Sequence, residues 1–262
     1  MCLFPVVACG IFLEKGLARV LLPVLTILFL ATLIRSAFGF GEALVAVPLL
    51  AFMMPVATAA PLAVLVSITV AIVAIAQDWR HIHLRSAAWL VLSTLVGLPL
   101  GLLALHRMDA RLVKAILAMV IVAFSGYSLL GRKRAALSDD RRAWIFGFAA
   151  GVLGGAYGMN GPPLVMYGSL RGWSPQHFRA TLQGYFLPAS LITLGGYGLT
   201  GLWTATVSRY YLMALPGVVL AIFLGRSINK RMNARAFILY VHAGLVIVGA
   251  LLLFQAVSGP AG

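Results

Sequence analysis

The sequence predicts an all-α, polytopic membrane protein built from two inverted structural repeats. Its composition is 62% hydrophobic and only 10% charged, whereas soluble domains contain about 25% charged residues. Apolar stretches such as Ala87–Leu105 are long and apolar on every face. This is typical of helices in lipid, because the strands of a membrane β-barrel alternate between apolar and polar residues. In addition, one order of apolar segments and glycine breaks occurs twice along the chain.

The first transmembrane repeat is predicted to cover residues 1–130. It begins with a glycine-broken helical hairpin, in which Leu17–Phe38 and the short segment Ala43–Met54 flank the break Gly39–Glu42. Three transmembrane helices follow, and we expect them at Thr58–Gln77, Ala87–Leu105 and Leu112–Leu130. Each has close to the 20 or so apolar residues that cross a bilayer.

A basic connector, residues 131–142, leads to the second transmembrane repeat, residues 143–262. Its predicted segments follow the same order: Ala143–Ala156, the break Tyr157–Gly161, the short Pro162–Leu170, and then Phe178–Gly198, Val207–Leu224 and Ala236–Val257. Short motifs correspond as well, namely Phe38–Gly41 with Tyr157–Asn160, Leu98–Gly101 with Ile222–Gly225, and Met108–Arg111 with Met232–Arg235. The halves therefore repeat in sequence and in hydropathy.

The basic residues predict that the two repeats are inverted. If each broken hairpin enters and leaves on one side, three crossings remain in each half, and the connector and the Arg226–Arg235 loop lie on the same side. By the positive-inside rule, that side is the cytoplasmic side of the inner membrane. A parallel repeat would separate these two basic segments. The net charge of +14 thus sits in connections between spans, which argues against a nucleic-acid partner.

The sequence contains no pattern typical of an enzyme or of a bound cofactor. It has no HExxH, GxSxG or P-loop motif and no pair of carboxylates within the membrane. Cys2 and Cys9 lack a CxxC spacing, and His81 and His83 supply only half of a zinc shell. We therefore expect no metal, no cofactor and no catalytic site, and any transport would run on an ion gradient, on the membrane potential, or downhill.

One acidic residue is placed where function is expected. Glu42 lies at a glycine break between two apolar segments, and ionisable groups at membrane depth usually have a function. Arg35 precedes it by two helical turns, so the two charges can neutralise each other. The alternative is that Glu42 only caps the helix that follows, and both roles can hold together.

The two breaks predict a binding site for a small anion. Non-helical backbone at membrane depth is tolerated when it is buried in protein or lines a water-filled cavity. The free N–H groups and positive dipole at the start of the next helix favour an anion. The alternative, glycines that only allow close helix packing, fits Gly97 and Gly101 better. The predicted substrate-binding residues are Arg35, Gly39, Gly41, Glu42, Ala43, Gly158, Asn160, Gly161, Pro162 and Gln183. For Gln183, a bond to a neighbouring helix is the alternative.

The residues at the breaks resemble a known family. Ala37–Ala43 with Val47-Pro48-Leu49-Leu50, and Gly154–Pro163, resemble the two repeat motifs of the sulfite exporter TauE/SafE family. The likeness extends from the first helix to the last. It implies a bacterial inner-membrane permease for small sulfur-containing anions such as sulfite or sulfonates. Glu42 departs from the glycine triplet that many members carry, and its charge disfavours an anion unless it is protonated or paired with Arg35.

These observations together predict a secondary transporter that moves a small anion, such as sulfite, a sulfonate or another oxyanion, by alternating access. Arg35 would supply positive charge, and Glu42 would balance it or carry a coupling proton. An anion channel on the same scaffold is one alternative. Another is a non-transporting membrane protein that binds a partner through the basic connector. Besides the substrate, the expected partners are membrane lipid and a proton or other coupling ion, and the sequence leaves a homo-oligomer open.

Overall fold

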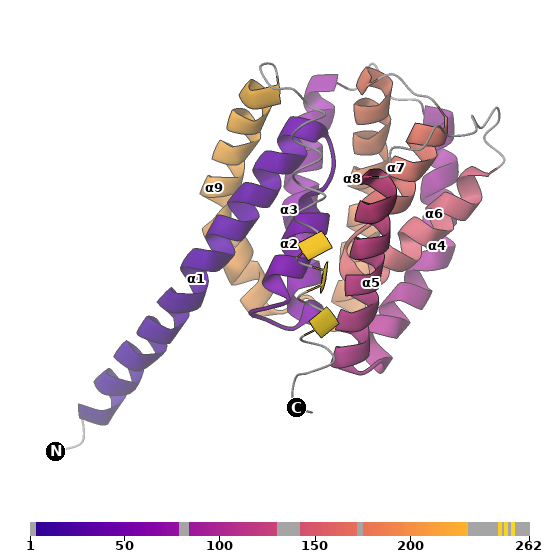
Figure 1. Cartoon of the computed structure of the whole chain (residues 1–262). Helices are drawn as coiled ribbons and strands as arrows, with labels where there is room; N and C mark the ends of the chain where they lie inside the picture. Colours follow the sequence, from indigo (N-terminus) through magenta and orange to yellow (C-terminus); the bar gives the residue numbers. More distant parts are fainter. Residues whose placement is uncertain are drawn as a thin grey trace.

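The computed structural model describes residues 4–78, 84–129, 142–171 and 175–229, together with six residues between 246 and 254. Within these ranges the chain is helical and contains no strand (Figure 1). The helices of the first half are α1 (Phe4–Phe38), α2 (Glu42–Leu50), α3 (Val56–Asp78), α4 (Leu84–Arg107) and α5 (Ala110–Leu129). Those of the second half are α6 (Ala143–Tyr157), α7 (Gly161–Leu170), α8 (Pro175–Leu199) and α9 (Ala205–Asn229).

The all-helical prediction is confirmed, although several bounds differ by a few residues, and α1 and α2 show why. α1 begins at Phe4 rather than Leu17, because a helix can continue through charged residues that interrupt an apolar run. α2 ends at Leu50 rather than Met54, because the turn that follows leads into Pro55, which disfavours helix in the residue before it. Residues 131–141 of the connector and most of the predicted span Ala236–Val257 lie outside the described residues.

Five of the described helices are long and apolar enough to cross a membrane, which confirms the multi-pass prediction. They are α1, α3, α4, α5 and α9, with apolar windows at Leu21–Phe38, Val56–Ala76, Ser86–Arg107, Ala110–Tyr127 and Ala205–Ile228. α2 and α7 have 9 and 10 residues, and at 1.5 Å per residue neither can cross a hydrocarbon core of about 30 Å. These two short helices are therefore not membrane spans of their own.

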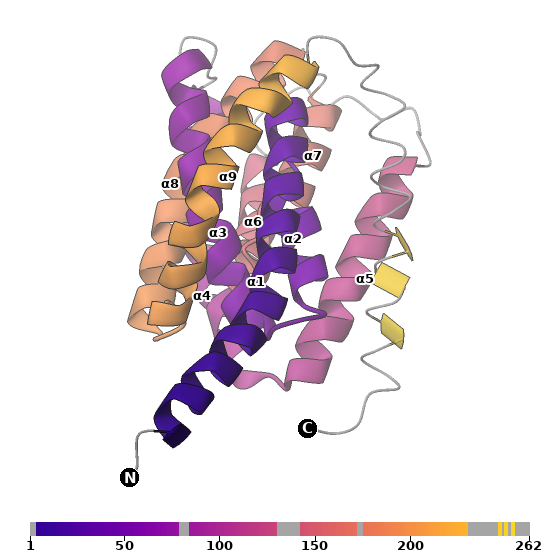
Figure 2. The same ribbon diagram turned by 90° about the vertical axis from the view of Figure 1, so that its left-hand side faces the viewer.

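Two helix pairs, each joining one half of the chain to the other, carry much of the packing. α4 lies along α6 and α1 lies along α9, while α3 packs against α8 between them (Figures 1 and 2). Glycines allow the α4–α6 contact: a Cβ added at Gly101 would lie 2.8 Å from the Ala156 nitrogen, and one at Gly155 would lie 2.5 Å from the Leu98 oxygen. Gly97 meets the α6 backbone in the same way. The close-packing interpretation of Gly97 and Gly101 is thus confirmed.

The α1–α9 contact uses the corresponding residues of the other half. A Cβ added at Gly225, the counterpart of Gly101 in the sequence repeat, would lie 2.6 Å from the Leu33 oxygen and 3.2 Å from the Ala37 nitrogen. Gly101 meets the Val152 oxygen and the Ala156 nitrogen of α6 in the same manner. In each pair, the two helices therefore approach each other at corresponding backbone atoms.

Candidate functional site

The two breaks are formed by glycines in the left-handed region of backbone space. Gly39 and Gly41 follow α1 with φ of 85° and 100°, and Gly158 follows α6 with φ of 66°. A side chain at these angles is strained, so glycine permits the chain to leave one helix and to begin another at once. At Gly158 a Cβ would also lie 3.0 Å from the Ala60 oxygen of α3. The second break is thereby packed closely against α3.

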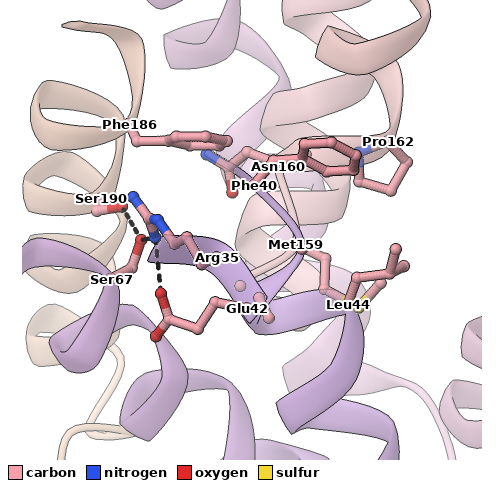
Figure 3. A pocket seen from close by; sticks show the side chains of 14 residues that line it. Arg35, Phe40, Glu42, Leu44, Ser67, Met159, Asn160, Pro162, Phe186 and Ser190 are labelled. Atoms are coloured by element: carbon pink, nitrogen blue, oxygen red, sulfur yellow. Dashed lines mark hydrogen bonds and ion pairs between the residues drawn. The ribbon is translucent and has the colours of Figure 1, made fainter. Parts of the chain in front are cut away.

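The starts of α2 and α7 open onto one small cavity of about 20 Å³ (Figure 3). Its walls come from both breaks and from the helices α1, α3 and α8. The lining residues are Arg35, Phe40, Gly41, Glu42, Ala43, Leu44, Ser67, Gly158, Met159, Asn160, Gly161, Pro162, Phe186 and Ser190. This volume is enough for one or two water molecules. The positive ends of two short helices thus share a single polar cavity, as expected of an anion site.

A buried ion pair stands at one side of this cavity. Arg35 Nη1 donates to Glu42 Oε2 at 2.7 Å, and the two side chains are only 3% and 1% exposed. Two charges are stable at this depth only when they are paired, because the desolvation of either one alone is costly. Glu42 Oε1 and Arg35 Nε have no hydrogen-bond partner in the described part of the chain. The pair is therefore held together by one short contact and has unused polar atoms.

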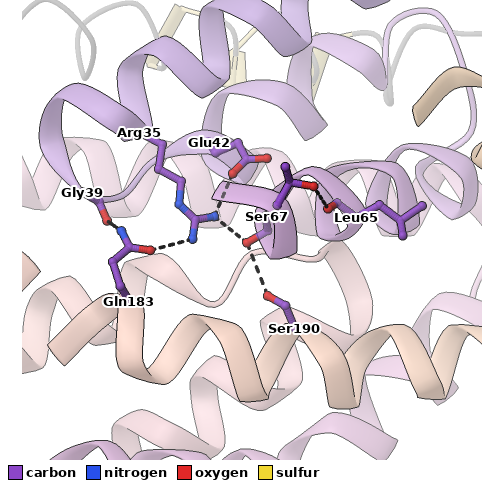
Figure 4. Close-up of polar contacts among 8 residues, drawn as sticks. Arg35, Gly39, Glu42, Leu65, Ser67, Gln183 and Ser190 are labelled. Atoms are coloured by element: carbon purple, nitrogen blue, oxygen red, sulfur yellow. Dashed lines mark hydrogen bonds and ion pairs between the residues drawn. The ribbon is translucent and has the colours of Figure 1, made fainter. Parts of the chain in front are cut away.

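Three further contacts hold the Arg35 guanidinium, and Figure 4 shows the two that are hydrogen bonds. Nη1 also donates to Ser67 Oγ of α3, and Nη2 donates to Gln183 Oε1 of α8 at 3.0 Å. The guanidinium carbon lies 4.7 Å from the centre of the Phe186 ring, within the range of a cation–π interaction. Arg35, on a helix of the first half, is thus oriented by residues of both halves.

Gln183 and Ser190 connect the halves around this arginine. Gln183 Nε2 donates to the carbonyl of Gly39 at 2.9 Å, so one amide holds both the arginine and the first break. Ser190 Oγ of α8 donates to Ser67 Oγ of α3 at 3.3 Å. In this way the α3–α8 contact places two hydroxyls at the cavity wall.

A second polar cluster lies behind the other break. Asn160 Nδ2 donates to the Tyr185 hydroxyl at 3.3 Å, and that hydroxyl lies 2.6 Å from Thr94 Oγ1. Thr94 in turn donates to the carbonyl of Gly147 at 2.9 Å. The Asn160 side chain folds over Gly154, where an added Cβ would lie 2.5 Å from Asn160 Oδ1. The amide is thereby fixed at the cavity by helices α4, α6 and α8.

Eight of the ten predicted site residues line the cavity. They are Arg35, Gly41, Glu42, Ala43, Gly158, Asn160, Gly161 and Pro162. Gly39 and Gln183 lie behind them and bond to each other, so Gln183 makes the inter-helix bond that was its alternative. The Glu42 carboxylate bonds Arg35 with one oxygen and has no partner for the other. It therefore lies in the first turn of α2 without capping a backbone N–H.

The sequence interpretation missed the cavity residues that come from long spans. Ser67, Phe186 and Ser190 line the cavity from the middle of α3 and α8, where single polar or aromatic residues in an apolar span give little signal. One signal was available: Ala57-Thr58 and Ala180-Thr181 are each followed, at the same distance, by Ser67 and Ser190. That correspondence within the repeat pairs the two serines.

A family model described as sulfite exporter TauE/SafE matches residues 24–252 of the chain. The chain belongs to the sulfite exporter TauE/SafE family. The resemblance in the two glycine motifs is confirmed, and with it the prediction of a membrane transporter with several transmembrane helices in a bacterial inner membrane.

A curated relative of this TauE/SafE protein is named "Probable sulfite/organosulfonate exporter TauE" and comes from Cupriavidus necator. It is 27% identical over 251 residues, which cover 92% of this chain and 98% of the relative. No solved structure matches the chain. Within the described residues, no group of three His, Cys, Asp or Glu side chains could hold a metal ion, and His81 and His83 lie outside them.

Proposed function

We propose that this protein is a secondary transporter for a small sulfur-containing oxyanion, such as sulfite or a short sulfonate, and that the cavity between the two breaks is its substrate site. The observation that carries this proposal is the meeting of two helix N-termini and a buried arginine at one cavity. Family membership and the name of the Cupriavidus necator relative support the substrate class.

Each part of the site has a role in binding. The free N–H groups at the start of α2 and the guanidinium of Arg35 are donors for oxyanion oxygens, and the start of α7, whose Pro162 and Pro163 carry no N–H, adds the positive end of its dipole. Asn160 offers an amide from the second break, fixed by Tyr185. Phe40, Met159 and Phe186 supply apolar walls that suit the remainder of an organic sulfonate. Glu42 balances the charge of Arg35 while the site is empty.

We further propose that the two halves are inverted repeats and that they work by alternating access. Matching backbone contacts at Gly101 and Gly225 support a local two-fold relation between the halves. The α4–α5 and α8–α9 turns lie at the same end of the molecule in Figures 1 and 2, which agrees with three crossings in each half. Transporters of this kind bind substrate near the midplane, between repeats, and expose it to each side in turn.

The test measures uptake of labelled sulfite and of a labelled short sulfonate into proteoliposomes. Arg35→Ala removes the charged donor, and loss of charge-assisted hydrogen bonds worth about 1.5–3 kcal/mol lowers affinity by about tenfold to a hundredfold. Glu42→Gln leaves Arg35 unpaired in the empty site. Net flux then falls, because the empty transporter must carry a buried, unpaired charge when it changes conformation to expose the site to the first side again. Asp109→Asn, in the exposed α4–α5 turn, is the control and keeps full flux.

A misfolded variant would also lose flux, so the neutral double variant Arg35→Gln/Glu42→Gln is measured beside the single ones. It keeps the charge balance of the core, and we expect it to fold and yet to bind no anion. Normal flux in Arg35→Ala and Glu42→Gln together would rule out this site. Counterflow of labelled against unlabelled substrate identifies a transporter, whereas single-channel currents would instead support an anion channel.

The rival function, a membrane protein that binds a partner through the basic connector, is tested separately. Replacing residues 131–142 by a neutral linker of equal length removes the docking surface that this function requires. Full anion flux in that variant supports transport as the function, and loss of flux with unchanged folding supports a role for the connector.

A further inference from the structure

The anion site is already filled by a carboxylate that belongs to the protein. Glu42 Oε2 accepts from Arg35 Nη1 at 2.7 Å, and the same nitrogen donates to Ser67. These donors, next to the start of α2, are the ones that an oxyanion requires. The Glu42 carboxylate therefore stands where a substrate oxygen would bind. A substrate anion reaches the arginine only by displacing it.

Displacement leaves Glu42 in an unfavourable state if it stays charged. The side chain is 1% exposed, so the one or two waters for which the cavity has room are all that could solvate a free carboxylate there. The incoming anion would add a second negative charge to the same small cavity. A buried carboxylate that loses its partner is stabilised by taking up a proton. Among the described residues Oε1 has no hydrogen-bond partner, so a proton bound there displaces no existing hydrogen bond.

The surroundings of Glu42 offer it no second positive charge within the described residues. Arg35 comes from α1, while α3 contributes the Ser67 hydroxyl and α8 contributes the Ser190 hydroxyl and the Phe186 ring. The break before α7 contributes the Asn160 amide, and Tyr167 of α7 belongs to a separate buried cluster. α5 also packs on α2, but its Arg111 and Lys114 are not part of the cavity wall. The charge of Glu42 therefore depends on Arg35.

We propose that Glu42 is a proton-binding site and that one proton binds together with each substrate monoanion. A proton from water adds to the Glu42 carboxylate, the Arg35–Glu42 ion pair breaks, and an oxygen of the anion takes the place of the carboxylate at Arg35. The site carries no net charge before this step and none after it. Substrate and proton then cross together, and the flux responds to the pH difference rather than to the voltage. This inference rests on the proposed function.

The experiment is isothermal titration calorimetry of the purified full-length protein in buffers that differ in ionisation enthalpy. The probe is ethanesulfonate, which remains a monoanion over the range, so any proton taken up binds to the protein. For the wild type we expect uptake of one proton per anion. Between about pH 5 and about pH 8 the apparent affinity should fall by up to about tenfold for each unit that the pH rises above the point where Glu42 ionises.

Two variants locate the proton. Glu42→Gln cannot ionise, so we expect it to bind ethanesulfonate without proton uptake and with an affinity that does not depend on pH. Asp109→Asn removes a carboxylate from an exposed turn and should behave as the wild type does. Thermal unfolding verifies that both variants are folded. If Glu42→Gln does not fold, the wild-type titration still decides whether a proton binds together with the anion.

Three outcomes are distinguishable. Binding by the wild type without proton uptake would overturn the coupling and leave the proposed function intact. Proton uptake that persists in folded Glu42→Gln would also overturn it, because the proton would then bind elsewhere. Failure of the wild type to bind either ethanesulfonate or sulfite would count against the proposed function itself.

Discussion

Single residues at the breaks control the site through backbone angles as much as through chemistry. Gly158 combines a left-handed φ of 66° with a close approach to α3, where a Cβ would lie 3.0 Å from both the Ala60 oxygen and a Val64 methyl. Gly195 in α8 is the opposite case, because nothing lies within 4 Å of a Cβ built there. Substitution by alanine should therefore have opposite effects on the free energy of unfolding at the two positions.

We predict that Gly158→Ala lowers the free energy of unfolding by about 1–3 kcal/mol, from strain at positive φ and from crowding against α3. Gly195→Ala should leave that free energy unchanged or raise it by a few tenths to about 1 kcal/mol, because alanine favours helix. Thermal or denaturant unfolding in detergent provides the measurement. Equal stability of the two variants would contradict the role given to the left-handed angle.

Two buried tyrosine hydroxyls have different roles, because one orients a site residue and the other only stabilises the fold. The Tyr185 hydroxyl accepts from Asn160 at the cavity and lies next to Thr94. The Tyr197 hydroxyl donates to the carbonyls of Gly154 and Gly155 in α6, at 3.0 Å in both cases, and does not line the cavity. Loss of either hydroxyl removes hydrogen bonds of similar kind, but only one of them orients a site residue.

We predict that Tyr185→Phe weakens anion binding by up to about tenfold, the equivalent of one hydrogen bond of about 0.5–1.5 kcal/mol, and that it also lowers the unfolding temperature, because its buried hydroxyl bonds both Asn160 and Thr94. Tyr197→Phe should lower the unfolding temperature and leave the anion dissociation constant unchanged. Titration of the anion and thermal unfolding of both variants test this. If both variants lose affinity equally, Tyr185 has no separate role in positioning.

At the scale of the helices, the α4–α6 pair depends on residues without side chains. A Cβ at Gly151 would clash with the carbonyl of Thr94 and lie 3.0 Å from the Leu98 nitrogen, whereas a Cβ at Gly126 in α5 meets none of the described residues within 4 Å. Close approach of two backbones gains van der Waals contact, which is what holds helices together in lipid. The position of a glycine, rather than the number of glycines, therefore decides what it contributes.

Gly151→Ala should separate α4 from α6 and lower the free energy of unfolding by about 1–3 kcal/mol, as overpacked contacts do. Gly126→Ala makes the same chemical change where space is free, and we expect no loss of stability. Because Thr94 and Gly147 connect this contact to Asn160, Gly151→Ala should also weaken anion binding. A stable Gly151→Ala protein with normal binding would show that the two helices can move apart without consequence.

At the scale of the whole molecule, inversion of the halves fixes which ends face which side. The proposed topology places the connector, residues 131–142, in the cytoplasm and the exposed α8–α9 turn at Thr200 on the opposite face. Single cysteines at Ser138 and Thr200, in a chain in which Cys2 and Cys9 are replaced, should react differently with a membrane-impermeant maleimide in whole cells. We expect labelling at Thr200 and none at Ser138 until the cells are opened. Labelling of both from outside would refute the inverted arrangement.

Much of this architecture is predictable from the sequence because lipid imposes strict rules on it. Apolar length locates the spans, and two glycine breaks locate the site, so Glu42 and Asn160 were identified from position alone. Ser67, Ser190 and Phe186 were not, because a residue in the middle of a long span gives no indication of which helix it will face. Helix pairings such as α4 with α6 depend on tertiary contacts between the halves, and short-range sequence patterns do not encode these contacts. The partner of Gln183, a helix more than one hundred residues away, was unpredictable for the same reason.

The glycine contacts between halves have a consequence for how the protein is made. α4 finds its close partner in α6, and α1 finds its own in α9, so each of these first-half helices packs against a helix synthesised later. Until α6 is synthesised, the glycine face of α4 lacks its packing partner. The partner of α1, α9, is synthesised later still. The contacts along the glycine face of α4 and along α1 can therefore form only after the second half has been synthesised.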